Sequence, residues 1–154
     1  MNNLTEEKEV TIVKEPTRKK KYNPAKPTAV YVGAAWAALG IGLISYCVGL
    51  YNATMALNEK GYYFTIILFG LFSVISVQKN VRDKAEGIPV TDIYYGISWF
   101  TTIASITLLV IGLRHADLQL SEKGFYAMAF TLALFSSITV QKNTRDLKAM
   151  AEEE

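Results

Sequence analysis

Two six-residue blocks carry the most distinctive polar groups of the chain, and both have the pattern Gln-Lys-Asn-x-Arg-Asp. They supply Gln78, Lys79, Asn80, Arg82 and Asp83, and then Gln141, Lys142, Asn143, Arg145 and Asp146. Paired Lys and Arg side chains can bind the phosphate of an anionic lipid headgroup or the carboxylates of a protein partner. The same residues can also serve structure alone, because cations are favoured at helix C-termini and anchor them at the membrane interface.

The repetition of the block favours a shared structural role, since bulk charge alone would not fix its Gln and Asn as well. We therefore expect structural anchoring, including bonding of the Arg82–Asp83 type between helical hairpins. Binding of lipid headgroups or of a partner by these ten residues is the alternative.

A second pair of blocks sets an acid beside a cation and a glycine. These blocks contain Asn58, Glu59, Lys60 and Gly61, and Ser121, Glu122, Lys123 and Gly124. Paired carboxylates can do acid–base chemistry or bind a cation, but no nucleophile or ligand set accompanies them. We interpret the blocks as helix caps at the outer membrane interface. Asn58 and Ser121 are the expected N-caps, each Glu lies in a first turn, and each Gly permits close helix approach.

Other site chemistry is not supported by the residue types present. A single Cys and a single His exclude a disulfide framework and a conventional zinc cage. The chain contains no P-loop, no Gly-rich dinucleotide turn, no HExxH and no serine-nucleophile elbow. We predict no catalytic residue, no metal site, no cofactor and no nucleic-acid partner.

The elements that must position these blocks are long apolar segments. All 16 Lys and Arg and all 14 Asp and Glu of the 154 residues lie outside the runs 29–51, 62–77, 93–113 and 125–140. Such segregation of charge excludes a soluble fold. A spanning helix needs roughly 20 apolar residues, and the polar blocks extend the two shorter runs. The sequence therefore predicts an all-α integral membrane protein with four transmembrane helices.

The chain also repeats itself with an offset of 63 residues. Residues 49–83 laid over 112–146 give 18 identities in 35 positions. Two helices return the chain to its starting side, so the repeats are parallel helical hairpins related by an axis along the membrane normal. The predicted organisation is a disordered basic cytoplasmic tail (1–28), a first two-helix repeat (29–83), a cytoplasmic linker (84–92), a second two-helix repeat (93–147) and a cytoplasmic C-terminal tail (148–154).

Small residues spaced four apart indicate where helices approach closely. They are Ala34, Ala38 and Gly42 in the first span, and Ala129, Ala133 and Ser137 in the fourth.

The distribution of basic residues predicts the orientation. Eleven Lys and Arg lie in the part of the N-terminal tail next to the first span (residues 18–26), in the 78–92 loop and in the C-terminal segment 142–148, against three on the other side. By the positive-inside rule, both termini are cytoplasmic.

The repeat resembles the bacterial YiaA/YiaB inner-membrane proteins, which carry the YiaAB two-helix domain. The resemblance covers residues 29–147 and rests on two copies of Glu-Lys-Gly-(Tyr/Phe)-Tyr and of Gln-Lys-Asn-x-Arg-Asp at matching positions. It favours the two-copy YiaA type and implies a small multi-pass protein of the bacterial inner membrane. No reaction, substrate or ligand residue carries over from it.

The spans contain no charged residue, which disfavours ion-coupled transport, because such transporters place ionisable groups within the membrane. We expect a non-enzymatic structural or accessory component that acts through helix packing and cytoplasmic contacts. Its expected partners are membrane lipids, with anionic headgroups among them, and a second copy or another membrane protein. The alternative is a small homo-oligomeric channel or passive transporter subunit, and a membrane enzyme using Glu59 or Glu122 is a distant third.

Overall fold

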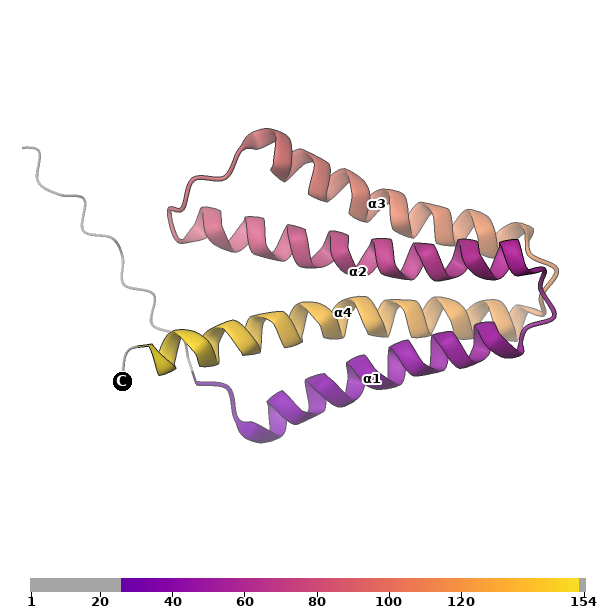
Figure 1. Cartoon of the computed structure of the whole chain (residues 1–154), viewed down its shortest axis with the longest axis horizontal. Helices are drawn as coiled ribbons and strands as arrows, with labels where there is room; N and C mark the ends of the chain where they lie inside the picture. Colours follow the sequence, from indigo (N-terminus) through magenta and orange to yellow (C-terminus); the bar gives the residue numbers. More distant parts are fainter. Residues whose placement is uncertain (1–25, 153–154) are drawn as a thin grey trace, which may run out of the picture.

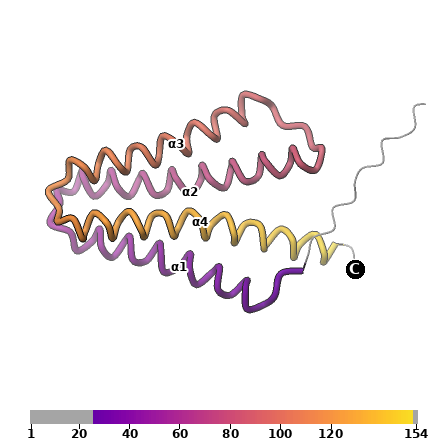
Figure 2. The backbone as a smooth tube through the Cα atoms, turned by 180° about the vertical axis from the view of Figure 1, so that it is seen from behind, coloured from indigo at the N-terminus to yellow at the C-terminus, as the bar shows by residue number. Residues whose placement is uncertain are grey.

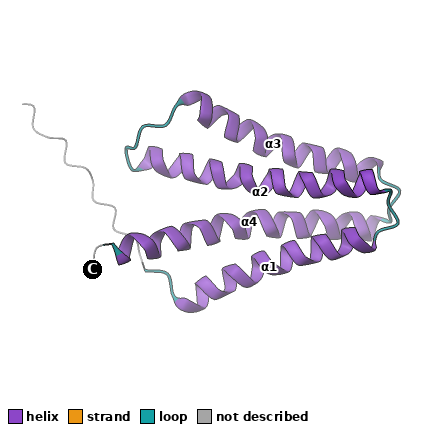
Figure 3. Cartoon of the chain, viewed as in Figure 1, coloured by secondary structure: helices purple, strands orange, loops and turns teal. Residues whose placement is uncertain are grey.

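The computed structural model describes residues 26–152, so the predictions for residues 1–25 and 153–154 lie outside the described part. Within it the chain forms four helices and no strand: α1 (Ala29–Asn52), α2 (Leu57–Ala85), α3 (Asp92–His115) and α4 (Leu120–Ala151) (Figure 3). Each helix is long and apolar enough to cross a membrane. The predicted all-α membrane fold with four spans is confirmed.

The helices pack in an order that the sequence left open. α1 lies along α4, α2 lies along α3, and α2 contacts α4 at the centre of the bundle (Figures 1 and 2). Consecutive helices of one repeat, α1 with α2 and α3 with α4, touch much less. Each closely packed pair therefore takes one helix from each repeat, and the two repeats interlock.

The bundle has two chemically distinct ends. At the charged end, formed by residues 78–92 and 141–151, α2 and α4 finish while α1 and α3 begin (Figure 1). At the opposite end, here the tyrosine end, lie the loops 53–56 and 116–119. Both helices that start at the charged end have a threonine N-cap. The hydroxyl of Thr28 accepts from the Tyr31 N–H at 3.3 Å, and that of Thr91 from the Tyr94 N–H at 3.4 Å.

The turn between α2 and α3 depends on Gly87. Its φ of 75° lies in the left-handed region, where glycine has no steric penalty. This conformation lets the Ile88 N–H donate to the Asp83 carbonyl at 2.8 Å, which closes the end of α2. The chain can then turn into Pro89 and α3.

Close helix approach is concentrated on a few small residues. A Cβ added at Gly42 of α1 would lie 2.8 Å from the Ala133 backbone nitrogen of α4. The predicted stripe of Ala129, Ala133 and Ser137 is buried, so its role in close packing is confirmed. In α1 the buried alanine is Ala35, whereas the predicted Ala34 is exposed.

Aromatic side chains fill the bundle near the tyrosine end. Tyr46 is completely buried, and its hydroxyl donates to the Tyr63 carbonyl at 2.9 Å. Its ring meets Tyr126 edge-on at 5.6 Å and lies 6.3 Å from Phe130. Buried side chains from α1, α2 and α4 thus fill the interior of the bundle around Tyr46.

Candidate functional site at the charged end

At the charged end, an arginine of each repeat forms an ion pair with an aspartate of the other repeat. Arg82 of α2 lies 3.3 Å from Asp146 of α4, and the equivalent Arg145 of α4 lies 3.4 Å from Asp83 of α2. The bonding predicted between hairpins is therefore present, and it runs from each Arg to the Asp of the other repeat. These two ion pairs join the ends of the two central helices.

Each aspartate also pairs with a lysine one turn earlier on its own helix. The Lys79–Asp83 and Lys142–Asp146 distances are both 2.8 Å. The aspartate side chains are only 9% and 1% exposed, whereas the lysine side chains are more than half exposed, so the aspartate end of each pair is shielded from water and the lysine end is not. Paired in this way, the buried carboxylates are compensated on two sides.

Glu86 breaks the symmetry of the network. It accepts from Arg82 Nε at 2.9 Å and from Arg145 Nη2 at 2.5 Å, and its repeat equivalent is Ala149. Sequence reasoning placed Glu86 in the linker and missed this role, although its spacing of four from Arg82 was an available signal. The resulting cluster of four cations and three carboxylates has a net charge of +1.

The two asparagines of the predicted blocks point inward. Asn80 and Asn143 are both 1% exposed, and Asn80 Nδ2 donates to the Ser98 hydroxyl of α3 at 2.9 Å. The repeat equivalent of Ser98 is Ala35, which cannot accept that hydrogen bond. Neither polar atom of the Asn143 side chain has a hydrogen-bond partner in the described part of the chain. Ser98 is a polar partner that the block pattern did not reveal.

Exposure divides the ten predicted binding residues into two groups. The side chains of Lys79 and Lys142 are 58% and 57% exposed, and Gln78 and Gln141 are half-buried beside them. The other six residues are buried or half-buried in the interface between the repeats: Asn80, Arg82, Asp83, Asn143, Arg145 and Asp146. Of the ten residues, the two lysines are therefore the side chains most accessible to the surroundings.

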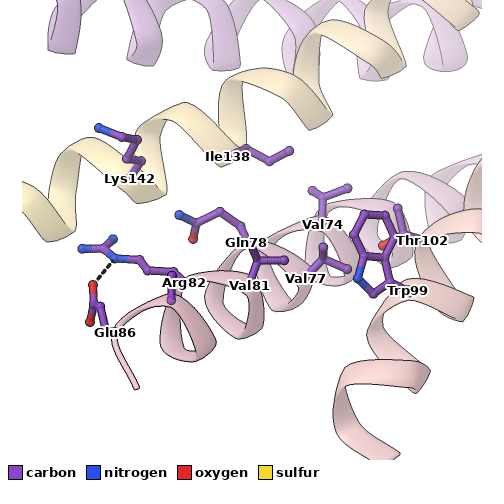
Figure 4. A pocket seen from close by; sticks show the side chains of 11 residues that line it. Val74, Val77, Gln78, Val81, Arg82, Glu86, Trp99, Thr102, Ile138 and Lys142 are labelled. Carbon is purple, nitrogen blue, oxygen red and sulfur yellow. Dashed lines mark hydrogen bonds and ion pairs between the residues drawn. The ribbon is translucent and has the colours of Figure 1, made fainter. Parts of the chain in front are cut away.

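A groove with a volume of about 630 Å³ opens beside this cluster, between α2, α3 and α4 (Figure 4). Its apolar wall is formed by Val74, Val77 and Val81 of α2, with Ile138 of α4 opposite them and Trp99 of α3 closing one end. Arg82, Glu86 and Lys142 lie at its other end, where α2 and α4 finish. The groove thus runs from an apolar region to a charged one.

The second pair of blocks forms caps at the tyrosine end, but from different residues than predicted. The N-caps are Ala56 and Gln119, two residues before Asn58 and Ser121, which lie inside the first turn. The Glu59 carboxylate accepts from the Ala56 N–H at 2.9 Å, and that of Glu122 from the Gln119 N–H at 2.8 Å. The cap at each helix start is therefore the acidic side chain of the third helical residue, and not the polar N-cap side chain that the sequence pattern predicted.

The remaining residues of these blocks have separate roles. Lys60 Nζ donates to the Tyr51 carbonyl at 2.8 Å, and Lys123 Nζ to the Arg114 carbonyl at 3.5 Å, so each lysine reaches the end of the preceding helix. The close approach predicted at Gly61 and Gly124 is wrong. A Cβ at either glycine would meet no neighbour within 4 Å among the described residues, because both lie on exposed first turns. Close approach near this end involves Gly49, which contacts Phe125, and Gly112, which contacts Tyr62.

No group of three His, Cys, Asp or Glu side chains suited to a metal ion occurs between residues 26 and 152. The acids of the charged end are instead bonded to Lys and Arg.

Comparison with known proteins finds relatives of this chain among bacterial membrane proteins. The model of the yiaA/B two helix domain matches residues 31–83 and again residues 94–146. The chain is 56% identical over 112 residues to the inner membrane protein YiaA of Escherichia coli, covering 73% of this chain and 77% of YiaA.

Two further relatives are more distant. The membrane protein YubF of Bacillus subtilis is 37% identical over 60 residues, which cover 38% of this chain and 69% of YubF. The inner membrane protein YiaB of Escherichia coli is 26% identical over 101 residues, which cover 64% of this chain and 83% of YiaB. No solved structure matches the chain.

Proposed function

Because this chain belongs to the YiaA/YiaB family and is a multi-pass inner-membrane protein, we propose that it is a non-enzymatic structural or accessory component. It contacts lipid headgroups and a membrane partner through its charged end. Helix packing holds that end in a fixed shape, and the exposed lysines make the contacts.

The observation that carries this proposal is that the charged end combines buried ion pairs between the repeats with exposed lysines. The reciprocal pairs Arg82–Asp146 and Arg145–Asp83 fix the ends of α2 and α4, while Lys79 and Lys142 remain more than half exposed. A fixed scaffold that presents cations at known positions loses little conformational entropy on binding an acidic surface.

Both termini are proposed to lie in the cytoplasm. By sequence, the residue ranges of the charged end (78–92 and 141–151) contain six Lys and Arg, and the segment that precedes α1 adds Arg18, Lys19, Lys20, Lys21 and Lys26, against three Lys and Arg at the tyrosine end. By the positive-inside rule, the side of the membrane with the excess of Lys and Arg is the cytoplasmic side. The exposed lysines would then face the cytoplasmic headgroups.

The proposal that the protein is not an enzyme is supported by the use of its loop carboxylates. Glu59 and Glu122 each accept a hydrogen bond from the start of their own helix. A carboxylate engaged as a cap is poorly placed to serve as a general base.

The test is native mass spectrometry of the protein extracted gently from its own membrane. The wild type is expected to form a defined heteromeric complex that the double variant Lys79→Ala/Lys142→Ala loses. Lys148→Ala is the matched control, because Lys148 is an exposed cation at the same end that lies outside the reciprocal network. If the Lys79→Ala/Lys142→Ala protein retained as much of the heteromeric complex as the Lys148→Ala protein, the proposed role of the two lysines would be contradicted.

The channel alternative needs a pore between copies, because aromatic side chains fill the interior of one copy near Tyr46. A closed homo-oligomer that carries solute across reconstituted liposomes would favour the channel over the accessory role.

A further inference from the structure

We propose that the groove between α2, α3 and α4 binds one anionic phospholipid, with an acyl chain along its valine wall and the phosphate at Lys142. This inference rests on the headgroup contact in the proposed function and deepens it, because it assigns one lipid to one side of the bundle.

The apolar part of the groove fits an acyl chain. Val74, Val77 and Val81 occupy successive turns of α2, so their side chains line the groove along the helix toward its charged end. Trp99 closes the groove on the α3 side. The volume of about 630 Å³ lies within the roughly 300–1,000 Å³ typical of small-molecule sites. A groove between membrane-spanning helices is surrounded by lipid chains, which are the apolar molecules present there in excess.

The charged end of the same groove fits a phosphate. Lys142 lies on its α4 side and Arg82 on its α2 side, and the Lys142 side chain is 57% exposed. Arg82 is held in place by Glu86 and Asp146, so the cations flank the mouth in a fixed arrangement. Of the charged residues that line the groove, Arg82 and Lys142 are cations and Glu86 is an anion, so the lining carries a net charge of +1, which complements an anion.

The combination favours a lipid over a protein occupant. One phospholipid carries an apolar chain and a negative phosphate joined in the order that the groove requires. A second copy of this chain entering within the membrane has no acidic residue in its spans to place near Lys142.

The repeat provides matched control positions on the other side of the bundle. Lys79 is the equivalent of Lys142, and Trp36 is the equivalent of Trp99. The valine wall is not repeated, because Ser137 and Thr144 stand where α2 has Val74 and Val81. The proposed site therefore belongs to one side only.

The experiment uses the full chain in phosphatidylcholine vesicles and reads tryptophan fluorescence. In a Trp36→Phe protein, Trp99 is the only tryptophan and reports on the groove, while a Trp99→Phe protein leaves Trp36 as the control reporter. Phosphatidylglycerol with brominated acyl chains is added at increasing mole fraction, and brominated phosphatidylcholine is added in parallel.

We expect brominated phosphatidylglycerol to quench Trp99 at mole fractions well below those needed for brominated phosphatidylcholine, with Trp36 showing no such preference. Lys142→Gln should raise the midpoint about fivefold, which corresponds to one lost charge near the surface, whereas Lys79→Gln, which removes a headgroup-contacting cation that does not line the groove, should raise it much less. Val81→Phe, which fills the groove from a side chain that is already 45% exposed, should abolish the preference. Thr144→Phe should not. Circular dichroism melting of each variant checks that the bundle is intact.

Three results would overturn the site. If Lys79→Gln and Lys142→Gln shifted the midpoint of Trp99 quenching equally, the lipid preference would be explained by diffuse headgroup attraction. The site would then be contradicted, and the proposed function would not. Competition by glycerophosphate as effective as that by the intact lipid would show an anion site without an acyl-chain groove. No preference for phosphatidylglycerol at either tryptophan would remove both the site and the headgroup part of the proposed function.

Discussion

The Arg82 guanidinium lies 3.3 Å from the Asp146 carboxylate of the other repeat. Asp146 is 1% exposed and also holds Lys142 at 2.8 Å, so it compensates two cations at the point where α2 and α4 end. In the same way, Asp83 receives Arg145 and Lys79. The duplicated blocks thus act as two halves of one interlocked network.

Asp146→Ala is expected to destabilise the bundle by about 3 kcal/mol, because it removes the buried carboxylate shared by Arg82 and Lys142 and leaves the buried Arg82 charge less fully compensated. The free energy of unfolding can be measured in mixed micelles by titration with sodium dodecyl sulfate. Lys148→Ala breaks only an exposed pair with Glu152 and should cost less than about 0.5 kcal/mol. If Asp146→Ala and Lys148→Ala cost the same, the network does not hold the helices together.

A double-mutant cycle tests the pair itself. Arg82→Ala combined with Asp146→Ala should cost clearly less than the sum of the single changes, because the double variant leaves neither charge of this pair buried alone. Strict additivity in the same titration would show that the two side chains do not interact energetically.

Gly42→Ala should destabilise the protein by about 1–3 kcal/mol, the usual range for overpacking. Its new Cβ would lie 2.8 Å from the Ala133 nitrogen and 3.0 Å from the Ala133 Cα, and backbone cannot move aside as a side-chain tip can. Gly40→Ala is the matched control, since a Cβ there meets no neighbour within 4 Å among the described residues. That change should be neutral or stabilising, because alanine favours a helix more than glycine does. Thermal unfolding of the two variants in one detergent decides the matter.

The unequal asparagines predict opposite effects at equivalent positions. Ser98→Ala removes the acceptor of Asn80 Nδ2 and should cost about 1 kcal/mol. Ala35→Ser places a hydroxyl at the equivalent position of α1 and should stabilise the protein by a similar amount, because the buried Asn143 has no side-chain hydrogen bond in the described part of the chain. The unfolding free energies of both variants test this, and a loss of stability in Ala35→Ser would contradict the equivalence.

Much of this architecture could be predicted from the sequence because the membrane constrains it strongly. Segregated charge defines four spans, and the 63-residue repeat relates Arg82 to Arg145 and Asp83 to Asp146. Bonding between hairpins followed from that pattern. The crossing of each Arg to the other repeat's Asp did not, because it depends on α2 and α4 being neighbours.

Helix pairing could not be predicted, since small residues occur on more than one face of the spans. Ala34 fits the spacing of four with Gly42, yet Ala35 is the buried residue, because α4 defines which side of α1 is covered. Departures from the repeat were equally hidden. Tyr46 and Leu109 occupy equivalent positions of the two repeats. The Tyr46 hydroxyl donates to the Tyr63 carbonyl, whereas leucine has no hydroxyl to form the equivalent hydrogen bond.

The caps at the tyrosine end give a sharp test of the roles of Glu59 and Glu122. Replacing either by Ala should cost about 1 kcal/mol, because the N-cap N–H of Ala56 or Gln119 loses its acceptor. Glu→Gln should retain most of the stability, since the amide oxygen can still accept that hydrogen bond. If Glu59→Gln were as damaging as Glu59→Ala in unfolding titrations, the negative charge rather than the cap would be the important feature.

The proposed orientation predicts which end of the bundle is accessible from outside an intact cell. In a Cys47→Ser background, which removes the single native cysteine, Asp117→Cys reports on the tyrosine end and Lys148→Cys on the charged end. A membrane-impermeant maleimide should label Asp117→Cys in cells with a permeabilised outer membrane, and Lys148→Cys only after the inner membrane is opened. The physical reason is the excess of Lys and Arg at the charged end, which opposes its translocation. The reverse labelling pattern would put the charged end and its exposed lysines outside the cytoplasm, and any partner would then have to be sought there.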